Sequence, residues 1–456
     1  MILAYVFISI TAIMLFFNLA LNVAKRRSLQ LAANAALLSI LSILAAYMLY
    51  SGYIYTAAGT ISFNPFSLFF ILVFTLGILL VNVLAYGHSE DYGSFALLAS
   101  FALIGMYLVS SSTSLITIFL GLELASIPTV FIVLISRKSL EAAAKFFIMA
   151  SIAVASFSFA MALVYGGTNA LSLSTVPKTA LMAFASVLFI ASIGFDASIF
   201  PFNIFIPDVY NGAPAYVTSM LGGINKKMGF AALIQVIILL FITSKSPFIV
   251  LAILSVFTMF YGNLAALRQE NLKRLLAYSS ISQAGYMLIG IAISTQYGIG
   301  ASLFQIFAHM FIFIGLLGIV GWLEGRDRHR ISDLIGLSGE NRFAAIAMTI
   351  FMLSLVGLPF TTGFVGKFLL FLGAVRSGFA WLAIIGIINS IISVYYYARP
   401  IMAAYTGRAG EYKIRMHRST LIVISACLAI TLVLGIFPSP LISITSNAGA
   451  YLFNAH

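Results

Sequence analysis

The amino-acid sequence predicts an all-α polytopic membrane protein with about 14 transmembrane helices. Three observations predict this fold class. Of the 456 residues, 62% are hydrophobic and only 8% are charged, whereas soluble domains carry about 25% charged residues. The apolar residues gather in about 14 segments, each long enough at roughly 20 residues to cross a bilayer. Lysine and arginine are distributed very unevenly among the loops that join these segments.

The apolar segments follow one another without a long polar linker, so we expect a single membrane domain, residues 1–456. The first segment has no basic region before its apolar run and is too long for a signal peptide. We therefore expect it to be the first helix. The expected helices begin near Ile2, Leu31, Leu68, Phe95, Leu115, Ala142, Thr179, Ala215, Phe248, Leu275, Ile299, Phe343, Trp381 and Thr420.

The net charge of +12 indicates membrane topology rather than nucleic-acid binding. If the N-terminus lies outside, the outer loops carry only Lys178, Lys245 and Arg376, as the positive-inside rule predicts. We expect a multi-pass protein of the cell membrane (inner or plasma membrane), in contact with the lipid bilayer and no nucleic acid, with its N-terminus outside. The inner loops then carry Lys25, Arg26, Arg27, Arg137, Lys138, Arg268, Lys273, Arg274, Arg326, Arg328, Arg330, Arg342, Arg399, Arg408, Lys413, Arg415 and Arg418.

The sequence argues against a cofactor held by this chain. Its one cysteine, Cys427, excludes a disulfide framework and cannot by itself hold zinc or an iron–sulfur cluster. It contains no P-loop, no G-x-G-x-x-G and no H-E-x-x-H pattern. We expect no cofactor and no metal site in this chain.

Several ionisable residues lie inside the apolar segments, where a charge costs at least ~2.5–3.5 kcal/mol at a helix centre. Each one alone could form a structural ion pair between helices. Together they favour a series of proton-transfer sites, because a desolvated lysine or carboxylate can load and release a proton near neutral pH. They are Glu123, Lys145, Asp196, Lys226, Lys227 and Lys367, joined by His309 as an uncharged or titrating group.

Two segments contain residues that interrupt helices. Residues 200–214 include Pro201 and Pro207, and residues 354–368 include Gly357, Pro359 and Gly363. Proline removes a backbone donor and clashes one turn back, so both helices are expected to break. Backbone freed at membrane depth persists only where protein buries it or water lines it. Paired broken segments predict inverted repeats with a transport path between them, whereas either one alone could be an ordinary proline kink.

Five runs of sequence resemble a known family. They are "GLELASIP" (121–128), "SLEAAAKFF" (139–147), "FPFNIFIPDVYNGAPAYVT" (200–218), "GNLAALRQENLKRLLAYSSISQAGYMLIG" (262–290) and "GLPFTTGFVGKF" (357–368). The chain resembles the antiporter-like membrane subunits of respiratory complex I (NADH-quinone oxidoreductase). The opening "GNLAALRQ" is most similar to the subunit N group of that family.

The resemblance implies fourteen helices with two inverted five-helix repeats, residues 94–243 and 247–402, each with one broken helix. Residues 1–93 and 419–456 would be flanking helices. It implies a water-linked proton path driven by quinone reduction elsewhere, with quinone, flavin and iron–sulfur clusters in partner subunits. The implied partners are the antiporter-like M and L type subunits and the small K and J type subunits. The residues that match the family positions are Glu123, Lys145, Lys226 and Lys367, on the fifth, sixth, eighth and twelfth helices.

The sequence departs from the family pattern at two positions. Asp196 stands five residues before Pro201, where the family has a lysine, and Lys227 stands where it generally has a small residue. Because the two departures have opposite charge, we predict an interhelical ion pair between Asp196 and Lys227. Glu123 is predicted to be the entrance or lateral link of the path. His309 is either part of the path or a packed, hydrogen-bonded histidine.

Other functions of the same fold stay open at this point. A subunit of a Mrp-type sodium/proton antiporter or of a membrane-bound hydrogenase would use the same lysines and glutamate. A membrane scaffold would need these residues only for assembly. A stand-alone solute transporter would need a pocket with substrate-specific polar groups, and the sequence gives no sign of one.

Overall fold

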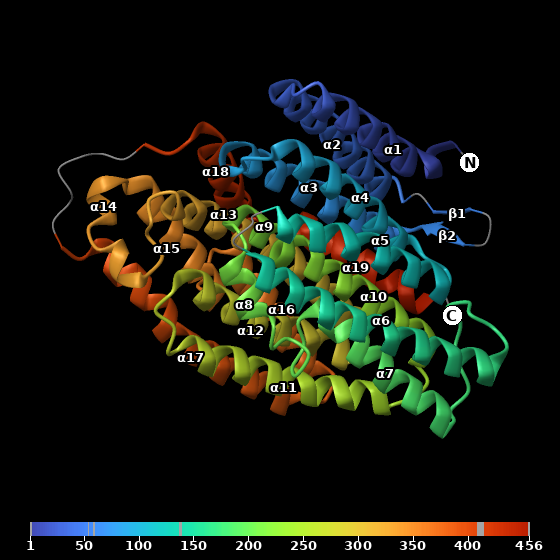
Figure 1. Ribbon diagram of the computed structural model, residues 1–456. Helices are drawn as coiled ribbons and strands as arrows, with labels where there is room; N and C mark the ends of the chain where they lie inside the picture. The colour runs from blue at the N-terminus through green and yellow to red at the C-terminus, as the bar shows by residue number, and fades with distance from the viewer. Residues whose placement is uncertain (1, 53, 58–59, 136–138, 408–414, 455–456) are drawn as a thin grey trace.

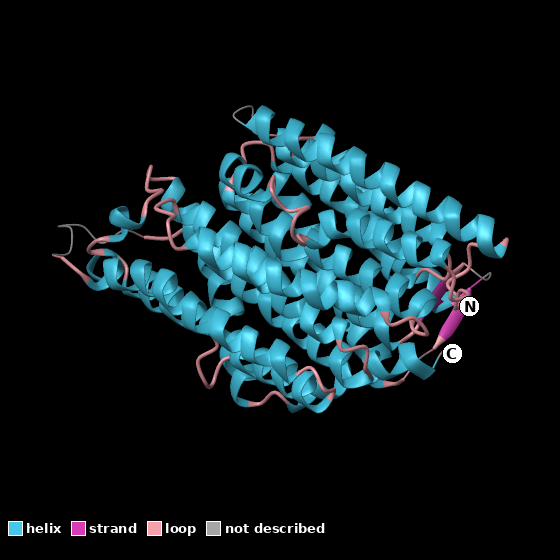
Figure 2. Cartoon of the chain, turned by 90° about the horizontal axis from the view of Figure 1, so that it is seen from below, coloured by secondary structure: helices cyan, strands magenta, loops and turns pink. Residues whose placement is uncertain are grey.

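The structure is a computed structural model that describes the chain except residues 1, 53, 58–59, 136–138, 408–414 and 455–456. Most of it is helical, with long helices packed side by side (Figure 1) and one short antiparallel hairpin at one end (Figure 2). The elements are α1 (Ile2–Val23), α2 (Arg27–Tyr50), β1 (Tyr55–Ala57), β2 (Ile61–Phe63), α3 (Pro65–His88), α4 (Tyr92–Ser111), α5 (Leu115–Leu134), α6 (Leu140–Thr168), α7 (Ala180–Ala197), α8 (Ile206–Gly212), α9 (Ala215–Met220), η2 (Leu221–Asn225), α10 (Lys226–Phe241), α11 (Ser246–Ala266), α12 (Leu272–Ala292), α13 (Gln296–Glu324), η3 (Ile331–Leu334), α14 (Leu337–Glu340), α15 (Arg342–Val356), α16 (Thr362–Arg376), α17 (Ala380–Tyr405), α18 (Arg418–Ile436) and α19 (Ser439–Asn454).

The predicted fold class is confirmed. Among the described residues, 13 helices are long and apolar enough to cross a membrane, and each lies at a predicted segment. The remaining predicted segment, near Phe343, is divided into α15 and α16. The separate helix α19 was not predicted. It continues α18 along α13, because Gly318 packs against Ile424 toward one end and Gly300 packs against Thr445 toward the other.

The centre of the molecule is α13, in which every residue of the most apolar 18-residue stretch is buried. In α12, and in the span formed by α9, η2 and α10, 94% of the residues of that stretch are buried. A helix that is hydrophobic all round belongs in the interior of a large bundle. Two of these three spans carry Lys226, Lys227 and His309, so these polar side chains lie in the interior.

Both predicted helix breaks are present. Helix α7 ends at Ala197, and α8 begins only at Ile206, with Pro207 in its first turn. Helix α15 ends at Val356, and α16 begins at Thr362. Gly357 follows α15 with a φ of +100°, a left-handed conformation that glycine adopts without a Cβ penalty.

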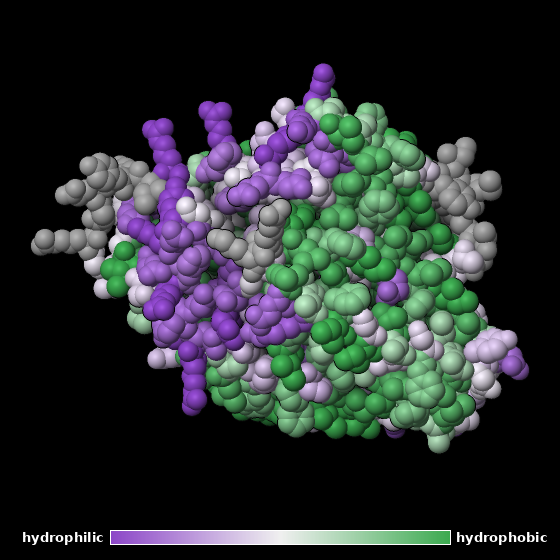
Figure 3. All heavy atoms as spheres, viewed as in Figure 1, coloured by the Kyte–Doolittle hydropathy of each residue, from purple (hydrophilic) through white to green (hydrophobic). Residues whose placement is uncertain are grey.

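The two ends of the bundle differ in polarity. Hydrophilic side chains gather at the end that carries α14, whereas hydrophobic side chains cover most of the rest of the face in Figure 3. We call this the basic end, because it includes the loop from Gly325 to Asn341. The hairpin lies at the opposite end, beside the N-terminus (Figures 1 and 2). Of the basic residues expected on the inner side, Arg137, Lys138, Arg408 and Lys413 lie outside the described residues.

Candidate functional site

Lys226 lies in the middle of its span, immediately after the π-helical turn η2. Such turns shift the direction in which the following side chains point, and they occur often at functional sites. The Lys226 side chain is buried, and its ammonium donates to the Ser280 carbonyl at 2.9 Å and also to the Ser280 hydroxyl. The main partner of Lys226 is therefore α12, through one residue that offers two oxygen atoms.

Lys227 points to a different helix. Its buried ammonium lies 2.7 Å from Nδ1 of His309 on α13 and donates to the carbonyl of Gly222 at 3.3 Å. His309 is also fully buried, and its ring stacks on Phe313. His309 is thus a packed, hydrogen-bonded residue, and it is the direct partner of a buried lysine.

The predicted ion pair between Asp196 and Lys227 is wrong. Within the part of the chain that the structure describes, Asp196 forms no ion pair. The reason is helix rotation. Gly229 packs against the backbone of Asp196 and Ala197, and a residue three positions earlier shares that face. Lys226 therefore lies on the side of α10 nearest α7, although its ammonium binds Ser280 on α12, and Lys227, about 100° further round, reaches α13.

Asp196 lies between two small cavities. One is lined by Glu123, Ser126, Ser192 and Asp196 among apolar residues, and the other by Asp196, Asn225 and Lys226. Each has room for about one water molecule. Asp196 thus stands in the middle of a line that begins at Glu123 on α5 and reaches Lys226 on α10.

Lys145 lies apart from the other residues predicted for the path. It is in the second turn of α6, with its side chain 41% exposed, and it forms ion pairs with Glu141 and Asp208, each at 2.8 Å. Asp208 also pairs with Arg274 at 3.3 Å. The line from Glu123 to Lys226 does not include it.

Lys367 is held by the second break. Its buried ammonium donates to the carbonyls of Leu355 at 2.8 Å and Val356 at 2.9 Å, and to the Ser390 hydroxyl at 3.0 Å. These carbonyls are the last of α15 and have no helical partner because the helix stops there. The negative end of the α15 dipole also favours a cation at this place. The Tyr286 ring lies 4.4 Å from the ammonium, a cation–π distance.

Helix α12 connects the two lysines. Ser280 binds Lys226, and Gln283, three residues later on the same face, donates to the Leu355 carbonyl at 3.1 Å. That carbonyl also accepts from Lys367. Gln305 on α13 donates to Gln283 at 3.0 Å. The sequence reasoning missed these uncharged residues, although the polar run "SSISQAGY" inside an apolar segment was a visible signal.

Buried polar atoms without a protein partner lie along this same line. Among the described residues they include Asn225 Oδ1, His309 Nε2, Gln305 Oε1 and Tyr286 Oη. Such atoms in proteins are nearly always hydrogen-bonded to protein or ordered water, and an apolar surrounding makes an unmade bond costly. The line therefore has the chemistry of a hydrated proton path, with ionisable groups at intervals and places for water between them.

Comparisons with known proteins identify the family of the chain. The family described as NADH:quinone oxidoreductase/Mrp antiporter, TM, matches residues 112–393. The chain is 35% identical over 402 residues to NADH-quinone oxidoreductase subunit N of Trichlorobacter lovleyi, covering 84% of this chain and 82% of that protein. It is 32% identical over 422 residues to F(420)H(2) dehydrogenase subunit N of Methanosarcina mazei, covering 86% and 85%.

The solved structures give the same result. A chain of respiratory complex I from Thermus thermophilus matches with a TM-score of 0.84 and 28% identity, over 96% of this chain and 99% of that one. The resemblance seen in the sequence is confirmed by relatives that carry the subunit N name and by a structure with the same fold. This chain belongs to the family of membrane subunits shared by NADH:quinone oxidoreductases and Mrp antiporters.

Proposed function

We propose that this chain translocates protons as the subunit N component of a complex I-type quinone oxidoreductase, in which NADH or a related donor reduces quinone. The observation that carries the proposal is the line of ionisable and hydroxylic groups from Glu123 through Asp196, Lys226 and Ser280 to Lys367. It passes through the bundle interior and ends at the second helix break. The names of the relatives from Trichlorobacter lovleyi and Methanosarcina mazei support the same assignment.

Each half of the line has a defined role in the proposal. Glu123 is the lateral link, and Asp196 passes protons between the two small cavities to Lys226. Lys227 and His309 act as a buried pair beside Lys226. Lys367 carries protons in the second half, where the helix break at Gly357 and Pro359 leaves the carbonyls that bind its ammonium without helical partners. The first half corresponds to residues 94–243 and the second to residues 247–402, with 1–93 and 419–456 as flanking helices.

The chain itself oxidises nothing in this proposal and holds no redox cofactor. Quinone, flavin and iron–sulfur clusters belong to partner subunits, and quinone reduction drives the proton path through conformational and electrostatic coupling. The partners are the antiporter-like M and L type and the small K and J type membrane subunits. The protein lies in the plasma membrane with its N-terminus outside, which places the basic end inside.

Replacement of Lys226 or Lys367 by alanine tests the proposal. Either change should sharply lower proton pumping and coupled quinone reduction in the assembled complex, measured in sealed vesicles with a pH-sensitive dye. Lys226→Arg should not restore pumping, because a guanidinium holds its proton too tightly to pass it on. Lys178→Ala is the matched control, because it removes an exposed lysine at the end of the bundle opposite to the basic end. Normal pumping by a fully assembled Lys226→Ala complex would contradict the proposal.

A further inference from the structure

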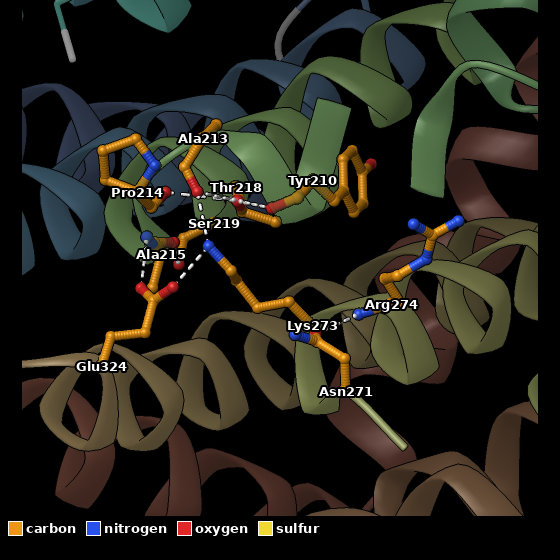
Figure 4. Close-up of polar contacts among 10 residues, drawn as sticks. All are labelled: Tyr210, Ala213, Pro214, Ala215, Thr218, Ser219, Asn271, Lys273, Arg274 and Glu324. Atoms are coloured by element: carbon orange, nitrogen blue, oxygen red, sulfur yellow. Dashed lines mark hydrogen bonds and ion pairs between the residues drawn. The ribbon is translucent and has the colours of Figure 1, made fainter. Parts of the chain in front are cut away.

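A buried ion pair lies near the basic end, outside the line described above. Lys273, the second residue of α12, pairs with Glu324, the last residue of α13 (Figure 4). The two side chains are only 7% and 19% exposed. The sequence placed Lys273 among loop residues, where a charge needs no explanation. Its burial beside a carboxylate at a membrane end does need one, because a buried pair must recover a desolvation cost.

The pair holds the start of the Lys226 span. The Lys273 ammonium donates to the Ala213 carbonyl at 2.7 Å, and Glu324 Oε2 accepts from the Ala215 backbone N–H at 3.1 Å (Figure 4). Ala215 is the first residue of the continuous helical span that ends at Phe241. Three spans that surround Lys226 thus meet at one ion pair, since α12 carries Ser280 and α13 carries His309.

A pocket opens beside the pair. It has a volume of about 360 Å³ and is lined by His88, Tyr216 and Glu324 among other residues. His417 and Arg326 lie close enough to His88 to act on it electrostatically, as does Glu324. The Glu324 carboxylate therefore has one side toward this pocket and the other toward the Lys273 ammonium.

From the ion pair, a route leads into the bundle toward Lys226. Ser280, the residue that binds Lys226, is seven positions after Lys273, so both lie on one face of α12 about 10.5 Å apart along the axis. The opposite wall is polar as well. The Thr218 hydroxyl donates to the Tyr210 carbonyl at 3.0 Å, and Tyr210 lines the cavity that contains Lys226 and Asp196.

We propose that the Glu324–Lys273 pair is the gate through which protons pass between the pocket at the basic end and Lys226. This inference rests on the proton-transport function proposed above. A proton from the pocket binds the Glu324 carboxylate and breaks the ion pair. The Lys273 ammonium then gives one proton inward, through hydroxyls and water, to neutral Lys226. The Glu324 carboxyl finally gives its proton to neutral Lys273, so the pair is restored and one proton has moved inward.

The alternative role for the pair is a static clamp, and Glu324→Gln separates the two roles. Glutamine has the same size, and its one amide oxygen can still accept from Lys273, although the Ala215 N–H then loses its acceptor. Most of a clamp therefore survives. Glutamine cannot bind and release a proton, so a gate is lost. We expect the Glu324→Gln complex to assemble with a modestly lower melting temperature, while pumping per assembled complex falls about tenfold or more.

A matched control comes from the same end of the molecule. Glu340 is buried and pairs with Arg328 at 2.5 Å, but the pocket with His88 is not lined by it. Glu340→Gln should leave the pumping rate of the assembled complex unchanged. Equal pumping by Glu324→Gln and wild type would overturn the gate, and an equal loss in Glu340→Gln would do so too.

Chemical rescue distinguishes proton transfer from a structural role, because weak acids can replace a lost proton carrier but cannot replace a lost contact. In the purified complex in detergent, where no gradient forms, small weak acids such as acetate can enter the pocket and deliver protons past the substituted side chain. Turnover of Glu324→Gln with a quinone analogue should then rise severalfold, whereas turnover of Lys226→Ala should not. If Lys226→Ala itself pumps normally, the proposed function fails; if only the Glu324→Gln results fail, the gate alone is wrong.

Discussion

Asp196 is one of the two residues at which the sequence departs from the family pattern that it resembles, and its position gives that departure a meaning. It lies between the cavity of Glu123 and the cavity of Lys226, where a carboxylate can exchange protons with either neighbour. The sequence identified Asp196 as a functional candidate because a charge inside an apolar segment is costly. It could not identify the neighbour, because helix rotation is set by packing at Gly229.

Asp196→Asn should lower proton pumping severely while the complex still assembles. Asparagine fills the same volume, but it cannot bind a proton and it removes the negative charge that faces Lys226. The measurement is pumping rate per assembled complex, with Asp333→Asn as the control, because Asp333 lies in the exposed loop at the basic end. Pumping at the wild-type rate in Asp196→Asn would remove Asp196 from the path.

The pair of Lys227 and His309 makes a separate prediction. His309→Leu leaves the Lys227 ammonium with one carbonyl acceptor, and a buried group that loses its partner costs about 1–3 kcal/mol, or more when it is charged. The melting temperature and yield of the complex should therefore fall. The double variant Lys227→Met/His309→Leu should recover much of this loss, as contacting residues do in a mutant cycle. Simple additivity of the two losses would show that the pair is not coupled.

At the scale of elements, both helix breaks were predictable from proline and glycine, because these residues act locally on the backbone. The identity of the carbonyls that receive Lys367 was not predictable. It depends on where α15 stops and how α16 returns past it, which tertiary packing decides. The π-helical turn η2 had no signal that we recognised in "LGGIN", although it directly precedes Lys226 and Lys227.

The second break depends on one close approach between its two halves. A Cβ built on Gly363 would lie 1.9 Å from the carbonyl oxygen of Ser354, so Gly363→Ala must push α16 away from α15. Overpacking of this kind typically costs about 1–3 kcal/mol, and it also moves Lys367 from the Leu355 and Val356 carbonyls. We expect a lower melting temperature and a larger loss of pumping. Gly166→Ala, a glycine with open space around it, should change neither quantity.

At the scale of the whole molecule, the sequence predicted the number and order of the spans well, because hydrophobic length is a property of each segment alone. It missed α19 as a separate helix, because the run after Pro438 is short and follows another apolar run. It also assigned Lys273 to a loop. Whether a charge near the end of a span is exposed or buried depends on neighbouring spans, here α13 and the start of α9.

The distribution of charge over the two ends predicts how the whole molecule sits in the membrane. Lys178 is exposed at the end opposite to the basic loop, and His329 is exposed within that loop. The one native cysteine, Cys427, is fully buried, so the unaltered chain supplies an unreactive background. Lys178→Cys should react with a membrane-impermeant maleimide in intact cells. His329→Cys should react only after the membrane is permeabilised, because the positive-inside rule places this loop inside. The reverse pattern would invert the topology, and the gate at Glu324 and Lys273 would then face the outside.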